Sequence, residues 1–163
     1  MNSSEGPLQG LLDPRYIFTE LRGPGMEDVL GEMARRLAAA GAIRDAADLT
    51  KRLLERERLG CTSLGGGVAI PHCKARDVQD IVLAIGLVPE GVDFHSPDGM
   101  PITLIFLILS PPDQPALHLQ TLARISRLLR TPGVGESLRR AGSREEILEA
   151  LKGPQGSLTT AGA

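Results

Sequence analysis

His72 follows a stretch of sequence that favours an unusual backbone path. Three consecutive glycines, Gly65, Gly66 and Gly67, can adopt conformations that other residues avoid. A short apolar segment then leads to Pro71, directly before the histidine. Because the imidazole pKa lies near neutrality, a histidine presented in this way is suited to act as a nucleophile, an acid or base, or a metal ligand. The same pattern is also typical of a glycine-rich turn with a histidine at a strand end.

Cysteine and histidine residues elsewhere raise two further kinds of chemistry. Cys73 beside His72 could act as a nucleophile, and both with His118 could bind zinc. Neither is strongly indicated, because adjacency in sequence does not make a catalytic pair and no second cysteine or histidine pair has ligand spacing. His118 is equally compatible with a core histidine bonded to a backbone carbonyl. His95 matches no motif, and we expect it in a surface turn.

The residues around His72 could also hold an anion. The charged run Glu55 to Arg58 is typical of a solvated helix face, but the guanidinium of Arg56 could bind a phosphate in a planar fork. Backbone amides in the glycine run could form an anion-binding concavity. Lys74 could attract an acidic group, although a solvated lysine fits as well. These alternatives stay open at the level of single residues.

Two apolar runs, 81–88 and 102–109, dominate the middle of the chain. Neither alternates with polar residues, which is typical of strands covered on both faces. A shorter strand is expected at 16–19. We therefore predict an α/β fold, a single domain in which a central mixed β-sheet of about five strands is flanked by helices on both faces.

Apolar spacing and capping residues predict five helices around this sheet. They span 26–41, 45–58, 114–130, 134–141 and 143 onward. In the third, His118 lies four residues before Leu122 on the apolar side. We therefore expect the side chain of His118 to point inward from the first turn.

The composition excludes several classes of function. The net charge is −2, and the four aromatic residues are three Phe and one Tyr, so no nucleic-acid surface is expected. The N-terminus lacks a secretory signal, and the apolar runs are about half the length of a membrane-spanning helix. We expect a cytoplasmic protein with free thiols and no direct membrane insertion. Residues 1–9 and 154–163 are expected to be a flexible leader and tail around a domain at 10–153.

The segment Gly-Cys-Thr-Ser-Leu-Gly-Gly-Gly-Val-Ala-Ile-Pro-His at 60–72 resembles a motif of a known family. With Arg-Glu before it and His118-Leu-Gln-Thr-Leu downstream, it is similar to the IIA domain of the bacterial phosphoenolpyruvate-dependent sugar phosphotransferase system. The branch it resembles is the fructose, mannitol and nitrogen-regulatory one. Two departures are visible: Cys61 stands where serine is usual, and Cys73 where a small residue often follows the histidine.

The resemblance implies a phosphotransferase component that uses no cofactor and no metal. It assigns His72 as the phosphorylated nucleophile, His118 as its neighbour at the phosphate, and Arg56 as the arginine that stabilises the phosphate. The remaining candidates for binding the phosphoryl group are Gly65, Gly66, Gly67, Thr62 and Lys74.

The resemblance also implies protein partners. The donor would be a small phosphohistidine carrier resembling HPr, and the acceptor a IIB domain. In the nitrogen-regulatory type, phosphorylation of His72 would instead control which target proteins are bound. The given sequence contains no fused IIB or IIC domain, which favours regulation. A binding-only regulatory module and, more remotely, a His/Cys zinc site are the alternatives.

Overall fold

The structure is a computed structural model that describes residue 8 and residues 10–153. Most of the expected leader and all of the expected tail therefore lie outside the described residues. Leu8 is the exception, because its side chain is buried in the core. The described residues form six strands and five helices, so the predicted α/β architecture is confirmed.

One mixed sheet contains the six strands. They are β1 (Leu12–Phe18), β2 (Ser63–Gly65), β3 (Val68–Ala69), β4 (His72–Lys74), β5 (Val82–Val92) and β6 (Ile102–Ser110). Their order across the sheet is β1–β5–β6–β3–β2, and β4 also pairs with β6. β5 and β6 are antiparallel, whereas β1 runs parallel to β5, and both β3 and β4 run parallel to β6.

The chain from Val68 to Lys74 forms two short strands rather than one continuous strand. Pro71 has no N–H to donate to a neighbouring strand, and it separates β3 from β4. Both strands nevertheless pair with β6, Val68 opposite Leu104 and His72 opposite Ile108. The sheet therefore has six strands in the described residues, where the sequence predicted about five.

The five predicted helices are all present within the described chain. They are α1 (Met26–Ala39), α2 (Ala46–Leu59), α3 (Pro115–Arg130), α4 (Val134–Arg140) and α5 (Arg144–Leu151). Caps act where the sequence places them: the Asp45 carboxylate accepts from the amide of Asp48 at 3.0 Å, and Ser143 caps α5 in the same way. No helix in this described part is both long and apolar enough to cross a membrane.

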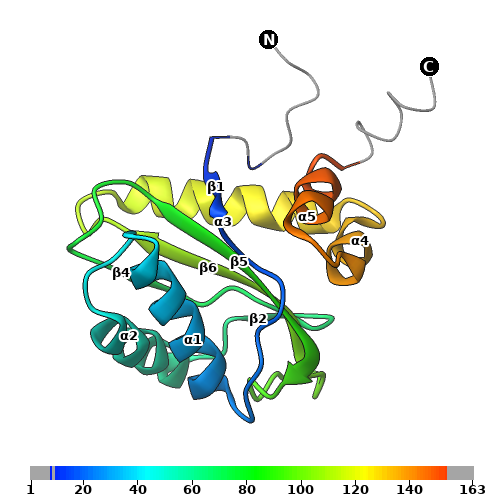
Figure 1. Cartoon of the computed structure of the whole chain (residues 1–163), viewed down its shortest axis with the longest axis horizontal. Helices are drawn as coiled ribbons and strands as arrows, with labels where there is room; N and C mark the ends of the chain where they lie inside the picture. The colour runs from blue at the N-terminus through cyan, green and yellow to red at the C-terminus, as the bar shows by residue number, and fades with distance from the viewer. Residues whose placement is uncertain (1–7, 9, 154–163) are drawn as a thin grey trace.

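Helices cover both faces of the sheet (Figure 1). α1 and α2 pack on one face, and α3, α4 and α5 pack on the other. Along β6, the odd-numbered residues from 105 to 109 lie in the core beneath α1 and α2, and the even-numbered residues from 104 to 108 lie in the other core. Because side chains alternate along a strand, a sheet covered on both faces needs apolar residues throughout. This arrangement explains the unbroken apolar runs.

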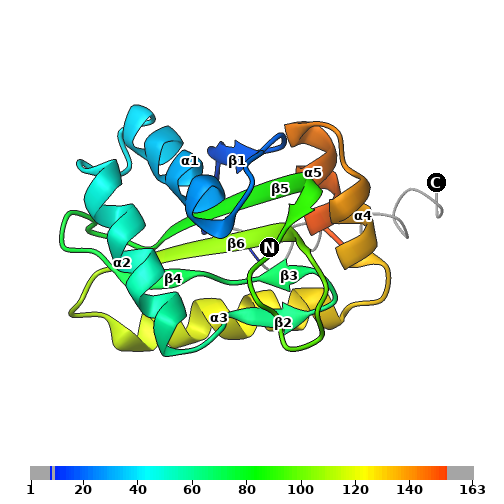
Figure 2. The same ribbon diagram turned by 90° about the horizontal axis from the view of Figure 1, so that it is seen from below.

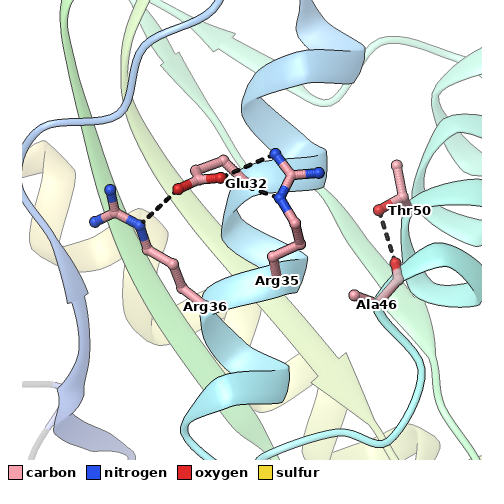
Figure 3. Close-up of polar contacts among 5 residues, drawn as sticks. All are labelled: Glu32, Arg35, Arg36, Ala46 and Thr50. Atoms are coloured by element: carbon pink, nitrogen blue, oxygen red, sulfur yellow. Dashed lines mark hydrogen bonds and ion pairs between the residues drawn. The ribbon is translucent and has the colours of Figure 1, made fainter.

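The outer surface of α1 is charged and lies away from the core. Glu32 accepts from Arg35 at 2.9 Å and from Arg36 at 3.1 Å, as Figure 3 shows beside the Thr50–Ala46 contact within α2. The Arg35 and Arg36 guanidinium groups hold the pKa of Glu32 below its ordinary value. Exposed pairs of this kind contribute less than about 1 kcal/mol. The buried apolar side of α1 therefore holds it on the sheet.

The side chains of β4 reach both helical layers around His72. In Figures 1 and 2 β4 lies between α2 and α3. Cys73 packs with the core beneath α1 and α2, whereas the ring of His72 contacts His118 of α3. Neighbouring residues of one short strand thus face different layers.

Candidate functional site

His72 is the first residue of β4 and is half-buried. Its Nδ1 lies 2.8 Å from the carbonyl oxygen of Ile70. Because a carbonyl oxygen can only accept a hydrogen bond, Nδ1 carries the proton in this contact. In the neutral ring the lone pair then lies on Nε2, which becomes the nucleophilic nitrogen.

The backbone that orients this ring is fixed by the sheet. The amide of Ile70 donates to the carbonyl of Thr62 at 3.0 Å, and the carbonyl of Pro71 accepts from the amide of Ile108 at 3.0 Å. The proline ring also fixes the φ of residue 71. The Ile70 carbonyl is therefore a rigid acceptor for the imidazole N–H.

His118 lies in the first turn of α3, and its side chain points toward the sheet as the helix pattern predicts. Its ring centroid is 5.0 Å from that of His72, and the two rings are inclined at 58°. Its Nδ1 is hydrogen-bonded to the hydroxyl of Ser110, the last residue of β6. Two histidines that are far apart in the sequence thus form one pair.

The pKa of His118 is lowered by its surroundings. Burial is the main cause, and the nearby His72, Lys74 and Arg56 lower the pKa further because positive charge opposes the addition of a proton. Since an ordinary histidine has a pKa of about 6.5, His118 is neutral at physiological pH. A neutral imidazole has one N–H to donate.

Arg56 and Lys74 bring positive charge to the histidine pair. Arg56 is in the last turn of α2, and its Nη1 donates to the carbonyl of Gly60 at 3.0 Å. Lys74 is exposed at the end of β4. Both act on the pKa of His118. Both cations are therefore near enough to His118 to disfavour its protonated form.

The three glycines lie elsewhere. They have positive φ angles of 86°, 65° and 84°; Gly65 ends β2, and Gly66 and Gly67 form the turn to β3. That turn adjoins Leu104, whereas His72 pairs with Ile108, four residues further along β6 and roughly 13 Å away. The amide of Gly66 already donates to Asp98 at 3.0 Å. A phosphate-binding role for Gly65–Gly67 stays a prediction that this placement does not support.

Thr62 is buried and is bonded to Glu57 of α2. Its amide and its hydroxyl both donate to the Glu57 carboxylate. The charge pattern of residues 55–58 predicted a solvated position for Glu57, and this was wrong, because the side chain is 8% exposed. Its spacing of four residues from the buried Leu53 was the available signal. A phosphate-binding role for Thr62 stays a prediction, since both of its donors serve the loop between α2 and β2.

Cys73 lies on the opposite face of β4 from His72. Burial raises the pKa of its thiol to about 11, so the thiolate needed for nucleophilic attack is scarce. Among residues 8 and 10–153, no three His, Cys, Asp or Glu side chains are gathered so that they could hold a metal ion. The alternatives of a cysteine nucleophile and of a zinc site at His72, Cys73 and His118 gain no support from this geometry.

Ser110 is a site residue that no pattern in the sequence indicated. It is 1% exposed, and its hydroxyl contacts His118. In the sequence it only marks the end of an apolar run before two prolines. Its place beside β4 depends on strand pairing between distant segments, which no local pattern reveals.

The site combines an unprotonated ring nitrogen with a neutral imidazole and two cations. Such a set suits a nucleophile that receives an anionic group, because fixed positive charge and N–H donors stabilise incoming negative charge. Nothing in this chemistry requires a thiolate or a metal ion. The geometry therefore favours transfer of a phosphoryl group onto histidine.

Comparisons with known proteins agree with this chemistry. Residues 10–153 match the family model described as "Phosphoenolpyruvate-dependent sugar phosphotransferase system, EIIA 2". The chain is 36% identical over 148 residues to a nitrogen regulatory protein of Bradyrhizobium diazoefficiens, covering 91% of this chain and 96% of that protein. It is 33% identical over 141 residues to the fructose-specific EIIABC component of Bacillus subtilis, covering 86% of this chain but 22% of that protein.

A solved structure gives the same result. The nitrogen regulatory protein IIA-Ntr from Neisseria meningitidis superposes with a TM-score of 0.79 at 31% identity, covering 86% of this chain and 96% of that one. The extent of these matches leaves little of the described chain unaccounted for. The resemblance seen around His72 and His118 thus extends over the whole fold, and the chain belongs to the EIIA 2 family of the phosphoenolpyruvate-dependent sugar phosphotransferase system.

Proposed function

We propose that this chain is a phosphocarrier in which Nε2 of His72 accepts a phosphoryl group from a phosphohistidine carrier resembling HPr and passes it to a protein acceptor. The observation that carries the proposal is the hydrogen bond from Nδ1 of His72 to the carbonyl of Ile70. It assigns the lone pair to Nε2 on a ring that is partly exposed to solvent.

In the transfer, the phosphoryl group moves from a ring nitrogen of the donor histidine to Nε2 of His72. The N–P bond of the donor breaks and its electron pair returns to the donor imidazole, while the lone pair of Nε2 on His72 forms the new N–P bond. The ring of His72 keeps its proton on Nδ1, where the Ile70 carbonyl stabilises the positive charge that the ring gains. Onward transfer is the same exchange in reverse, with a different imidazole or another nucleophile as acceptor.

The surrounding cations balance the charge of the phosphoryl group. A protein-bound phosphate brings about −1.5 to −2 charges at neutral pH. Arg56 and Lys74 supply positive charge beside the histidines, and His118 supplies an N–H donor. Because Arg56 is held by the Gly60 carbonyl, it is oriented before the phosphate arrives. These groups stabilise the phosphoryl group without forming a covalent bond to it.

We infer that the output is regulatory rather than the uptake of one sugar. Relatives that match over almost their full length, from Bradyrhizobium diazoefficiens and Neisseria meningitidis, are named nitrogen regulatory proteins. The fructose-specific relative, by contrast, matches over only 22% of its length. Transfer to a IIB domain is the second candidate, because a mannitol IIA of this fold has been solved in complex with phosphorylated IIB. The cytoplasmic location expected from the sequence stays a prediction.

Phosphorylation in a defined mixture tests the proposal. Incubation with phosphoenolpyruvate, Enzyme I and HPr should add one phosphate that is labile in acid and stable in base. His72→Ala should abolish this labelling. His95→Ala should not, because the side chain of His95 is 84% exposed and has no proposed role in the transfer. Labelling that persists in His72→Ala would show that another residue is the acceptor.

A second mixture separates the two outputs. The phosphorylated protein is incubated with a IIB domain of the fructose type and with one of the mannitol type. Retention of the phosphate on His72 in both mixtures supports the regulatory output. Rapid transfer to either IIB domain would favour transport instead.

A further inference from the structure

Ser110 is a buried serine beside the histidine pair. It is the last residue of β6, it is 1% exposed, and its hydroxyl is hydrogen-bonded to Nδ1 of His118. Its backbone is fixed as well, because its carbonyl accepts from the amide of Ala75 at 2.9 Å. A buried hydroxyl on a fixed strand is therefore in contact with one of the two histidines.

The pairing of β4 with β6 places Ser110 on the same face of the sheet as His72. His72 is opposite Ile108 and Lys74 is opposite Ser110, and paired residues in parallel strands point to the same face. Cys73 and its partner Leu109 point to the other face. Neighbouring strands are about 4.8 Å apart, so one strand pair supplies both the proposed nucleophile and the serine.

The state of His118 makes this contact important. Burial and the nearby positive groups keep its ring neutral, so the ring carries one proton on either Nδ1 or Nε2. If Nδ1 accepts a hydrogen bond from the Ser110 hydroxyl, the proton is on Nε2, at the far edge of the ring. If Nδ1 carries the proton instead, Nε2 presents a lone pair, which would repel a phosphate oxygen.

We propose that Ser110 is a positioning residue that holds His118 in the tautomer with its proton on Nε2, so that this N–H can donate to the phosphoryl group on His72. The inference rests on the proposed function. It adds that a serine acting through His118, and not touching the phosphate itself, determines whether the second histidine attracts or repels the transferred group.

The control for this inference is Thr121. It is also 1% exposed, and its hydroxyl donates to the carbonyl of Leu117 within α3 at 2.8 Å. Thr121→Val therefore removes a buried hydroxyl from α3, the helix that carries His118, and the hydrogen bond of that hydroxyl is to a backbone carbonyl and not to a histidine. Loss of packing or stability should affect Thr121→Val and Ser110→Ala alike, whereas loss of tautomer control should affect Ser110→Ala alone.

The test combines a spectroscopic and a kinetic measurement. Nitrogen-15 NMR of the imidazole rings reports the tautomer of His118, and the return of phosphate from His72 to unphosphorylated HPr reports the transfer rate. Wild type should show the Nε2–H tautomer. Ser110→Ala should show a mixture and slow both labelling and return by about tenfold, comparable to the loss when a group that orients a metal-binding histidine is removed. Ser110→Thr should restore both, and Thr121→Val should match wild type.

Each outcome decides one point. An Nδ1–H tautomer of His118 in wild type would overturn the inference even if Ser110→Ala failed to fold. Wild-type tautomer and rates in Ser110→Ala would overturn it as well. If wild type were not phosphorylated at His72 at all, the proposed function would fail first, and the tautomer measurement would still show whether Ser110 controls His118.

Discussion

The two faces of β4 differ in chemistry although their residues are neighbours in the chain. On the α3 face, His72 is half-buried, bonded to the Ile70 carbonyl and paired with His118. On the other face, Cys73 is packed against the core beneath α1 and α2, and burial raises the pKa of its thiol to about 11. One face makes its functional group available, and the other keeps it inert.

This difference shows that strand alternation, not residue type, separates the two roles. Histidine and cysteine are both capable nucleophiles, and in the sequence they are adjacent. Because side chains alternate along a strand, a shift of one residue in the pairing with β6 would exchange their environments. The register of His72 opposite Ile108 is therefore what assigns the chemistry.

Exchanging the two residues is the strongest test of whether the face of β4 determines the chemistry of the residue on it. In the double variant His72→Cys with Cys73→His, the imidazole enters the apolar core and loses the Ile70 carbonyl. Labelling by HPr should be abolished, and the free energy of unfolding should fall by about 1–3 kcal/mol for the buried unpaired polar group. Phosphate incorporation and urea unfolding measure the two effects.

The single variant Cys73→Ala is the control for this exchange. It should be phosphorylated like wild type, since the thiol has no role in transfer, and should lose about 1 kcal/mol of stability through the small cavity. If the exchanged protein were still labelled on histidine, the face of β4 would not decide the chemistry.

Much of the fold follows from patterns that are local in the sequence. The unbroken apolar runs predict β5 and β6, because strands covered on both faces bury every position. Asp45 and Ser143 predict the starts of α2 and α5, since their side chains accept bonds from amides a few residues away. Such features require only near neighbours. The starts of β5, β6, α2 and α5 lie within one residue of the predicted positions, whereas β5 continues to Val92, four residues beyond its predicted end at 88.

Most of the features that the sequence did not reveal depend on pairing between distant segments. Ser110 contacts His118 because β6 ends where α3 turns back over β4. Glu57 is the exception, because its buried carboxylate accepts from the amide and the hydroxyl of Thr62, only five residues along the chain. The glycine run was expected beside His72 because it is near in sequence, but pairing along β6 separates the two. Proximity in the chain is a poor guide to proximity across a sheet.

Removing the partner of His72 should have a smaller effect than removing His72 itself. His118→Ala deletes one N–H donor but leaves the nucleophile and its carbonyl partner. We expect labelling to reach one phosphate per chain, with return to HPr slowed by about 10²-fold, as for loss of one donor to developing charge. Rapid-quench measurement of the return step tests this, and an unchanged rate would reduce His118 to a packing role.

The two cysteines should differ in their reactivity toward iodoacetamide at pH 8. Cys61 is exposed, whereas Cys73 is partly buried and has a raised pKa, so about one Cys73 thiol in a thousand is ionised at that pH. We expect Cys73 to react at least tenfold more slowly than Cys61, allowing for the greater nucleophilicity of a more basic thiolate. Mass spectrometry of the modified peptides measures the ratio, and equal rates would show that the second face of β4 is open to solvent.

The smallest effect concerns stability and pH on the α3 face. Burial, together with His72, Lys74 and Arg56, lowers the pKa of His118 in the folded chain, so the unfolded chain binds more protons when the pH lies near or below about 6.5. Its contribution to stability is therefore fully present above that pH and is lost as the pH falls through the lower folded value. Thermal unfolding of wild type and His118→Gln between pH 7.5 and 5 isolates the contribution, because every other titrating group is shared. Wild type should lose more of its melting temperature on acidification than His118→Gln, by a modest margin because His118 is only half-buried, and parallel losses would mean that the ring of His118 is as free to protonate in the folded chain as in the unfolded one.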